Sequence, residues 1–142
     1  MRAVIQRAAG AQVVVDGQVT AQFDGEGFVV LLGVTHTDGE EQAATMARKI
    51  AQLRLLRSER SLEDAAAPVI VVSQFTLYGQ ARKGRRPTWN AAAPGPVAEP
   101  LVERVVTLLK ERGLSVGQGV FGAEMAVTLT NDGPVTLVVD ID

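Results

Sequence analysis

Apolar positions along the first 34 residues follow the spacing of β-strands. The expected strands cover residues 3–6, 12–15, 18–23 and 28–34, the last of which (FVVLLGV) is apolar throughout. Such a continuous apolar run is typical of a strand buried on both faces. Asp16-Gly17 separates two of these runs and predicts a hairpin, because both residues of the pair tolerate a positive φ.

Two later segments repeat apolar residues every three or four positions, which predicts amphipathic helices. The first helix is expected to begin near Thr37, where Thr37 and Glu40 fit a capping box, and its apolar stripe continues to Leu53. The second is expected over residues 97–112, with Gly113 as its C-terminal cap. Between the two helices, residues 57–67 are polar and then Ala-rich, so we expect a loop there.

Three more strands complete the pattern, at residues 68–77 (PVIVVSQFTL), 124–130 and 135–140. The last two are expected to be joined by a turn at residues 131–134, since Asn, Asp, Gly and Pro are the usual turn formers. Because the strands are not each followed by a helix, a doubly wound parallel sheet is disfavoured. We predict one α+β domain over residues 1–142, with a largely antiparallel, twisted and barrel-like sheet and two helices.

Composition removes several classes of function. The chain has no cysteine and a single histidine, His36, which excludes thiolate nucleophiles, zinc–sulfur sites and multi-histidine metal sites. We therefore expect no metal and no cofactor. The formal net charge of −2 means that any affinity for nucleic acid must come from a local patch. The first ten residues do not read as a secretory leader and no apolar run is long enough to span a bilayer, so we expect a cytoplasmic protein.

The familiar catalytic motifs are missing as well. His36 has no sequence cue that ties it to a serine, and neither GxxxxGK[ST] nor GxGxxG occurs. Two polar clusters remain, at residues 73–77 and 131–136. On a strand, Gln74 and Thr76 would share one face, and such polar side chains need a hydrogen-bond partner, solvent or a cavity. Taken singly, each cluster is explained more simply by backbone hydrogen bonds or by a turn than by chemistry.

Together the two clusters change this interpretation. SQFTL at 73–77 and NDGPVT at 131–136 resemble the paired signature motifs of the D-aminoacyl-tRNA deacylase family. The resemblance covers nearly the whole chain, because it extends to MRAVIQR at the start, LLGV at 31–34, RKGRRPTW at 82–89 and FGAEM at 121–125.

Some positions depart from the family pattern. Residues 57–67 read RSERSLEDAAA, where the family usually has a longer segment with a stretch resembling Gly-Lys-Met-Asn. What this segment contributes to the site is therefore open. Trp89 and Glu124 are milder departures, since the family often has Phe and Asp there.

The resemblance implies a homodimer that hydrolyses the ester between a D-amino acid and the 3′-terminal adenosine of tRNA. It also implies that Gly133-Pro134 forms a cis peptide that enters the active site of the partner subunit, with Arg7 and Asn131 supporting the bend. Rigid backbone carbonyls facing the substrate α-carbon would then reject L-amino acids by collision, which can supply the large discrimination that proofreading needs. Glycine has no Cβ, so glycyl esters would also be hydrolysed.

Hydrolysis without His or Cys would use an ester that is already activated, the neighbouring ribose hydroxyl, and an oxyanion hole of backbone amides near Phe75 and Thr76. We expect Thr76 to position the substrate, with a nucleophilic role as the second interpretation. Gln74 would hold the ester or the α-amino group, and Ser73 completes the expected catalytic set.

Contacts with the RNA are expected at two places. Phe121 would pack against the terminal adenine, or else be a core side chain. Four cations in the long Gly- and Pro-rich segment 78–96 would contact phosphates, or else simply face solvent; these are Arg82, Lys83, Arg85 and Arg86. Two alternative functions stay open, namely a non-catalytic RNA-binding module and a general esterase that uses Thr76.

Overall fold

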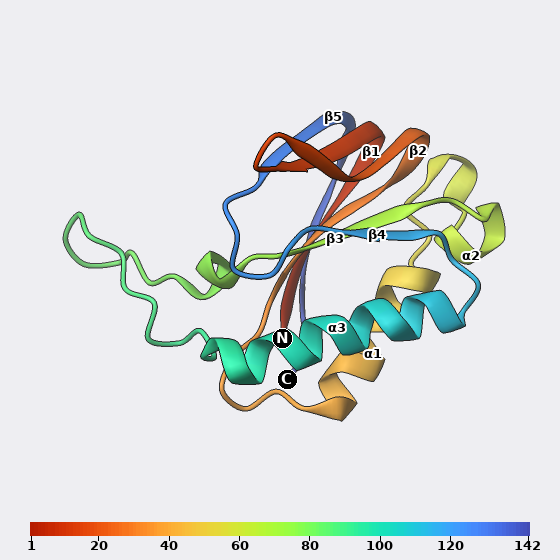
Figure 1. The fold of residues 1–142 in the computed structure, drawn as a ribbon. Coiled ribbons are helices and arrows are strands. Elements are labelled where there is room, and N and C mark those ends of the chain that lie inside the picture. The colour runs from red at the N-terminus through yellow and green to blue at the C-terminus, as the bar shows by residue number, and fades with distance from the viewer.

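Five strands form one mixed sheet in the order β4-β3-β2-β1-β5. The structure, a computed structural model, describes all of residues 1–142 (Figure 1). The strands are β1 (Arg2–Val15), β2 (Gln18–Gly33), β3 (Val69–Ser73), β4 (Val116–Gln118) and β5 (Ala126–Asp140). The long strands β1, β2 and β5 pair antiparallel, whereas β3 joins β2 in parallel and β4 joins β3 in parallel. The α+β class is confirmed, and the sheet is antiparallel only across its three long strands.

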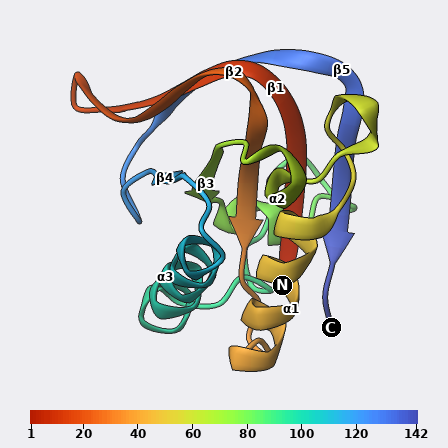
Figure 2. The same cartoon turned by 90° about the vertical axis from the view of Figure 1, so that its right-hand side faces the viewer.

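The predicted hairpin at Asp16-Gly17 is confirmed. Val15 pairs with Gln18, and the two turn residues have φ angles of 49° and 74°. The short runs on either side merge into two long strands, because β1 continues through a register shift at Gly10 instead of ending there. These long strands arch over one end of the molecule (Figure 2).

The segment 131–134 is not a turn between two paired strands, so that expectation is wrong. Asn131 pairs with Ala8 and Thr136 pairs with Gln6, so both halves of β5 run along the same neighbour β1 in the same direction. Residues 132–135 are the excess that bulges out opposite the single residue Arg7. The Gly133-Pro134 peptide within this bulge is cis.

The strand expected to reach Leu77 ends at Ser73. Gln74 leaves the strand with φ −146° and ψ 81°, and residues Phe75–Tyr78 form the 3-10 turn η2. The amide of Leu77 donates to the carbonyl of Gln74 (3.2 Å), and the amide of Gly79 donates to that of Thr76 (2.9 Å). These local hydrogen bonds replace the sheet pairing that a continued strand would need, so the expected alternation of faces over 74–77 does not occur.

The two expected long helices are present as α1 (Glu40–Gln52) and α3 (Gly95–Glu111). The cap of α1 differs from the expected box: the N-cap is Gly39, whose amide donates to Gln42 Oε1 at 2.8 Å. Asp38 is the reason, since its carboxylate binds the Thr35 amide (2.8 Å) and keeps the chain in a turn before the helix. Gly113, with a φ of 83°, ends α3 as expected.

Residues 57–67 are structured, which corrects the expectation of a loop. They contain the 3-10 turn η1 (Arg57–Glu59) and the short helix α2 (Leu62–Ala65). Ser61 and Asp64 form a capping box with both hydrogen bonds at 3.0 Å. Hydrogen bonds from the Ser61 amide and side chain to the carboxylate lower the pKa of Asp64. Leu62 is fully buried, so α2 is fixed to the core by its first residue.

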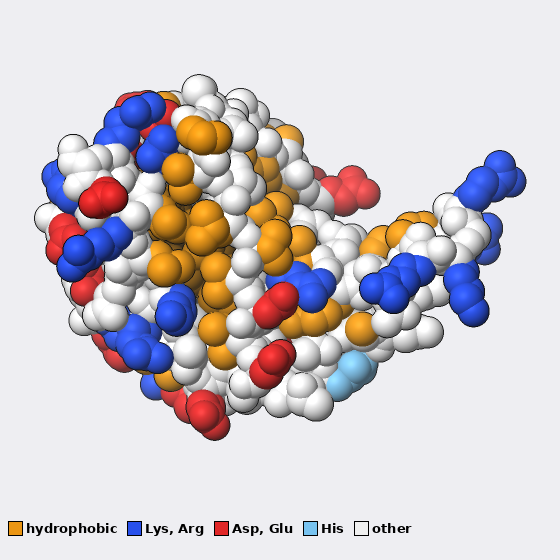
Figure 3. Space-filling model, turned by 180° about the vertical axis from the view of Figure 1, so that it is seen from behind, with side chains coloured by type: hydrophobic (Ala, Val, Ile, Leu, Met, Phe, Trp, Pro, Cys, Tyr) orange, Lys and Arg blue, Asp and Glu red, His pale blue; other side chains and the backbone are white.

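Helices α1 and α3 cover one face of the sheet, as Figures 1 and 2 show. The largest core cluster lies between them and the sheet, and its bulky members include Ile5, Phe28, Leu32, Met46, Ile50 and Leu109. Seen from behind, apolar side chains form a broad area on the side where β5 is the sheet edge, and Val138 of that strand is 64% exposed (Figure 3). None of the helices is long and apolar enough to cross a membrane.

Candidate active site

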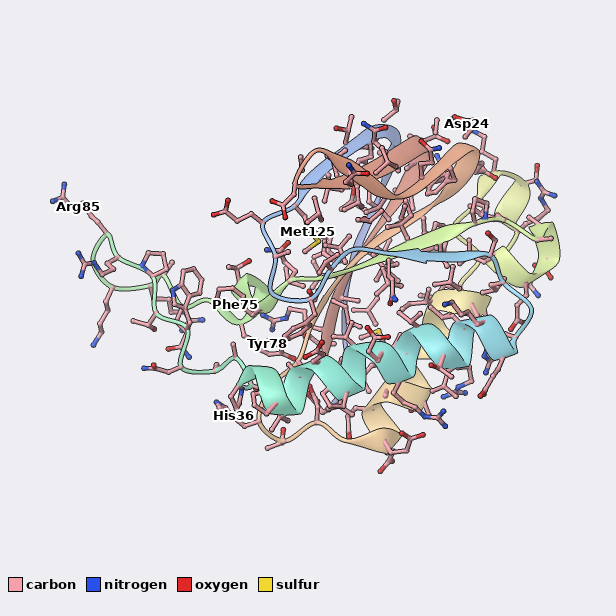
Figure 4. The ribbon with its side chains drawn as sticks, viewed as in Figure 1. Asp24, His36, Phe75, Tyr78, Arg85 and Met125 are labelled. Atoms are coloured by element: carbon pink, nitrogen blue, oxygen red, sulfur yellow. The ribbon has the colours of Figure 1, made fainter.

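A pocket of about 490 Å³ opens at the carboxyl end of β3. Its walls come from the end of β3, the loop before α3, the first turns of α3 and residues 121–127. Most of the lining is hydrophobic, and Ser73 and Gln74 supply polar groups. Clefts of this volume with few polar groups are typical small-molecule sites, and the carboxyl ends of parallel strands are a usual place for them. Figure 4 shows Phe75 and Met125 on this side of the molecule.

The structure brings Gln74 and Thr76 together, although through the turn η2 and not through one strand face. Gln74 Nε2 donates to Thr76 Oγ1 at 2.6 Å. Phe75 lies beside the pocket opening and is 56% exposed. No base activates Thr76 in this arrangement, because a glutamine amide that donates a hydrogen bond cannot accept the proton of the hydroxyl.

The amides of Phe75 and Thr76 begin the turn η2. In such a turn the first amides have no partner within the turn itself, since the first internal bond is the one from Leu77 to Gln74. They are therefore available as donors at the end of the strand, next to the pocket. An oxyanion hole needs donors of this kind aimed at one oxygen, so these two amides are the candidates for it.

Arg7 holds the bulge in β5. This arginine is buried, and its Nε and Nη2 donate to the carbonyl oxygens of Asp132 (3.0 Å) and Gly133 (3.4 Å). Its Nη1 donates to the carbonyl of Leu55 at 3.2 Å. Three carbonyls on two distant segments are thus joined by one rigid guanidinium, which fixes the direction of the Gly133-Pro134 bend.

Gln6 and Asn131 brace the other side of the bulge. Gln6 Nε2 donates to Asn131 Oδ1 (2.9 Å) and to the carbonyl of Val135 (3.1 Å), and Thr136 Oγ1 donates to Gln6 Oε1. The sequence analysis named Asn131 but missed Gln6. A polar side chain inside an otherwise apolar strand was the signal that could have found it.

Arg57 is a second residue that the sequence analysis missed. Its guanidinium forms a two-point contact with the carboxylate of Asp132, through Nε to Oδ2 (3.2 Å) and Nη2 to Oδ1. Its amide donates to Glu26 Oε2 at 3.0 Å. The divergent segment 57–67 therefore reaches the bend, but no pattern in RSERSLEDAAA shows which of its residues does so.

Gly133 and Pro134 are exposed and do not line the pocket of their own chain. Phe121 lines the pocket and is also packed against the core, and its role toward the adenine stays a prediction. His36 lies apart from the site, with Nε2 2.7 Å from the carbonyl of Asn90.

The four expected cations lie on a projecting arm. Gln80 and Thr88 exchange both backbone hydrogen bonds (2.9 and 3.0 Å), which closes residues 81–87 into a hairpin-like loop. Arg82, Lys83, Arg85 and Arg86 are all exposed, and Figures 3 and 4 show the basic end of the arm far from the body. Trp89 stands at the base of this arm and lines the pocket.

Comparison with solved structures places the fold among known ones. The structure matches one described as "c-Myc DNA Unwinding Element Binding Protein" with a TM-score of 0.90, 35% sequence identity and coverage of 100% of this chain and 99% of that chain. It also matches a structure described as "a probable eukaryotic D-amino acid tRNA deacylase" with a TM-score of 0.87, 17% identity and coverage of 99% and 98%. At 17% identity the second likeness shows the fold alone.

Sequence comparison gives the family. Residues 4–140 match the family described as D-Tyr-tRNA(Tyr) deacylase. The D-aminoacyl-tRNA deacylase of Streptomyces coelicolor is 60% identical over 141 residues, covering 99% of this chain and 100% of that protein. The D-aminoacyl-tRNA deacylase of Beutenbergia cavernae is 61% identical over 140 residues, covering 99% of both. The chain belongs to the D-Tyr-tRNA(Tyr) deacylase family, and the resemblance inferred from its motifs is confirmed.

Proposed function

We propose that this chain hydrolyses the ester bond of D-aminoacyl-tRNA, releasing the free D-amino acid and tRNA, and that it also hydrolyses mischarged glycyl-tRNA. The observation that carries this proposal is that the end of β3 and the start of η2, residues Ser73 to Phe75, line the pocket, in a chain that matches D-aminoacyl-tRNA deacylases over its whole length. Because the substrate is aminoacyl-tRNA, we expect the enzyme to act in the cytoplasm.

The working enzyme is a homodimer in this proposal, with each active site at the subunit interface. Three features support a second copy as partner: β5 is a sheet edge, Val138 on it is largely exposed, and the Gly133-Pro134 bend is held rigidly although it faces outward. A long exposed strand edge favours pairing with another chain. The bend of one subunit would then enter the pocket of the other.

The bend gives the enzyme its preference for D-amino acids. Such an enzyme must accept many side chains and yet distinguish two mirror-image α-carbons. A pocket for the side chain would select by side-chain identity and not by configuration. Main-chain atoms of Gly133-Pro134, fixed by Arg7, would leave room for a hydrogen on the α-carbon but not for Cβ or the ammonium group of an L-residue. Glycine presents only hydrogens at its α-carbon, which is why glycyl esters pass the same test.

Ester hydrolysis depends on position and on hydrogen-bond donors in this proposal. The amides of Phe75 and Thr76 donate hydrogen bonds to the carbonyl oxygen of the ester and stabilise the negative charge that develops on it. Loss of a single such donor lowers the rate by about 10²–10³. Gln74 and Thr76, already hydrogen-bonded to each other, orient the ester, and Ser73 lines the same wall. The ribose hydroxyl next to the ester supplies the acid–base group that the pocket lining lacks.

The 3′ end of the RNA binds in the pocket and along the arm in this proposal. The terminal adenine packs against Phe121, and the cations of the arm contact phosphates of the acceptor end. The arm projects from the body (Figure 1), and Trp89 at its base lines the pocket, so one strand of RNA can reach both.

The test is hydrolysis of D-Tyr-tRNA and L-Tyr-tRNA by the purified protein. We expect turnover of the D form, turnover of Gly-tRNA, and discrimination against the L form of about 10⁴-fold, which steric exclusion can supply. Equal rates on the two Tyr-tRNA forms would remove the role of the bend. Binding of tRNA without turnover would support a non-catalytic RNA-binding module, and hydrolysis of simple esters that is lost completely in Thr76→Ala would support a general esterase.

A further inference from the structure

Two aromatic side chains are exposed next to each other at the mouth of the pocket. Phe75 is 56% and Trp89 43% exposed, their ring centroids are 5.5 Å apart, and their planes meet at 77°. The other large apolar side chains that are exposed in this chain are all valines. Only 4% of the residues are aromatic, so an exposed pair of rings in contact is unusual for this chain and indicates a binding surface.

The position of Trp89 is fixed by the backbone around it. A Cβ at Gly79 would lie 2.6 Å from Cζ3 of the indole and 2.9 Å from the carbonyl oxygen of Thr76, so only glycine lets the ring pack this closely. The residues just after Trp89 are tied to the body, since Thr35 Oγ1 donates to the carbonyl of Ala91 at 2.6 Å. A platform held in this way loses little freedom when a ligand stacks on it.

Charge indicates which ligand fits the two rings. Trp89 follows Arg85 and Arg86 closely in sequence, at the base of the cationic arm, and both Trp89 and Phe75 line the pocket. Pocket, rings and cations therefore follow one another in space. Aromatic faces next to a positively charged track are the means by which proteins hold single-stranded nucleic acid, whose bases and phosphates alternate. A purely apolar partner would gain nothing from the cations.

We propose that Phe75 and Trp89 form a second nucleotide subsite, which stacks the base of the nucleotide preceding the terminal adenosine. This inference rests on the proposed function, because it assumes that the terminal adenosine occupies the pocket. It makes the enzyme specific for a single-stranded 3′ end, since a paired base cannot stack on the rings. Stacking is tolerant of base identity, as every base has a π-face.

Binding of three non-hydrolysable ligands tests the subsite by calorimetry. Each ligand carries a D-tyrosyl amide on its 3′-terminal adenosine: the nucleoside alone, the dinucleotide with a preceding cytidine, and the dinucleotide with an abasic preceding residue. We expect the cytidine ligand to bind about 5- to 150-fold more tightly than the abasic one, the range that stacking of one base on an aromatic ring supplies. Trp89 is the only tryptophan of the chain, so its fluorescence should be quenched more strongly by the cytidine ligand than by the nucleoside or the abasic ligand.

Variants separate stacking from packing. Trp89→Leu keeps an apolar side chain against Gly79 and should lose the gain from cytidine, whereas Trp89→Phe should keep most of it. Val19→Ala removes an exposed apolar side chain on the distant hairpin and should leave the gain unchanged. Trp89 also lines the pocket, so the gain is taken as the ratio of cytidine to abasic affinity within each variant, and detectable binding of the nucleoside alone by Trp89→Leu shows that the pocket is still folded.

The outcomes distinguish the subsite from the activity it rests on. If the cytidine and abasic ligands bind equally while the nucleoside binds, the subsite is refuted and the deacylase proposal stands. If the nucleoside does not bind at all, the proposed function fails first. Tryptophan emission that shifts on dilution of the protein, with no response to cytidine, would show that a second copy of the chain covers the rings, which also overturns the subsite.

Discussion

Arg57 binds the carboxylate of Asp132 from a segment 75 residues earlier in the chain. Arg7 Nε is 3.4 Å from the same carboxylate, so one acidic side chain is shared by two guanidinium groups. The side chains of Arg7 and Asp132 are 9% and 14% exposed, whereas that of Arg57 is 65% exposed. The bend is thus braced from the interior by one arginine and from the surface by the other.

Replacing Arg57 tests whether this outer brace matters for selectivity. We expect Arg57→Ala to lower the ratio of D- to L-Tyr-tRNA hydrolysis by about tenfold, because loss of the two-point contact with Asp132 loosens the bend. The free energy of unfolding should fall by no more than about 1 kcal/mol, since an exposed ion pair contributes little to stability. Arg48→Ala, an exposed arginine on α1, is the matched control. An unchanged ratio would mean that Arg7 suffices.

The role of Thr76 can be separated from that of the RNA. Thr76→Ala should retain activity, reduced by about tenfold. The variant loses one hydrogen bond from Gln74, but Thr76 is not the nucleophile in this proposal. Replacing the 2′-hydroxyl of the terminal ribose by hydrogen should cost about 10²–10⁴, the usual contribution of a positioned acid–base group. Single-turnover rates on D-Tyr-tRNA measure both. Complete inactivity of Thr76→Ala with full activity on the deoxy substrate would assign the chemistry to the threonine.

The basic arm should make tRNA binding dependent on salt. If two to four of its cations contact phosphates, a plot of log affinity against log salt concentration should have a slope of about −1.5 to −3. Reversing the charges of Arg85 and Arg86 together should flatten that slope and raise KM. Arg48→Glu changes charge on the distant helix α1 and should leave the slope as it is. Equal slopes for the arm variant and the unaltered protein would show that the arm faces solvent.

Tyr78 should report on folding at alkaline pH. Burial and the carboxylate of Asp38 raise its pKa to about 12, with Arg2 acting in the opposite direction. Because the folded state holds this proton more tightly, its contribution to stability is complete below the ordinary pKa of about 10 and is lost as the pH rises towards 12.

The measurement compares the free energy of unfolding of the unaltered protein with that of Tyr78→Phe between pH 9 and about 12. The difference between the two should shrink across that interval. Tyr78 is the only tyrosine, so tyrosinate absorbance follows it directly, and its midpoint should be higher in the folded protein than in urea. Coinciding midpoints would contradict the effect of burial.

Local patterns were enough to predict the elements with a strong period or a specific turn residue. The hairpin at Asp16-Gly17, the two long helices and the cap at Gly113 are all present. The errors concern places where a distant segment outweighs the local signal. Asn131 to Pro134 looks like a turn, yet pairing of both flanks with β1 makes it a bulge.

The divergent segment shows the same limit at the level of the site. The family motifs identified the Ser73–Thr76 cluster and the Gly133-Pro134 bend, because those residues form contiguous and unusual strings. Arg57 is one arginine among several in its segment, and nothing near it in the chain distinguishes it. Its significance depends on Asp132, which folding brings to it from another strand.

The sequence alone was thus enough to predict the class of fold, the family and two of the motifs, because each depends on neighbouring or regularly spaced residues. The pocket, the brace on the bend and the pair of exposed rings exist only after the sheet has formed. They depend on contacts between segments far apart in the chain, such as Gln6 with Asn131 and Phe75 with Trp89. Periodicity reports which side of an element is apolar, but it contains no information on which distant residue will lie opposite.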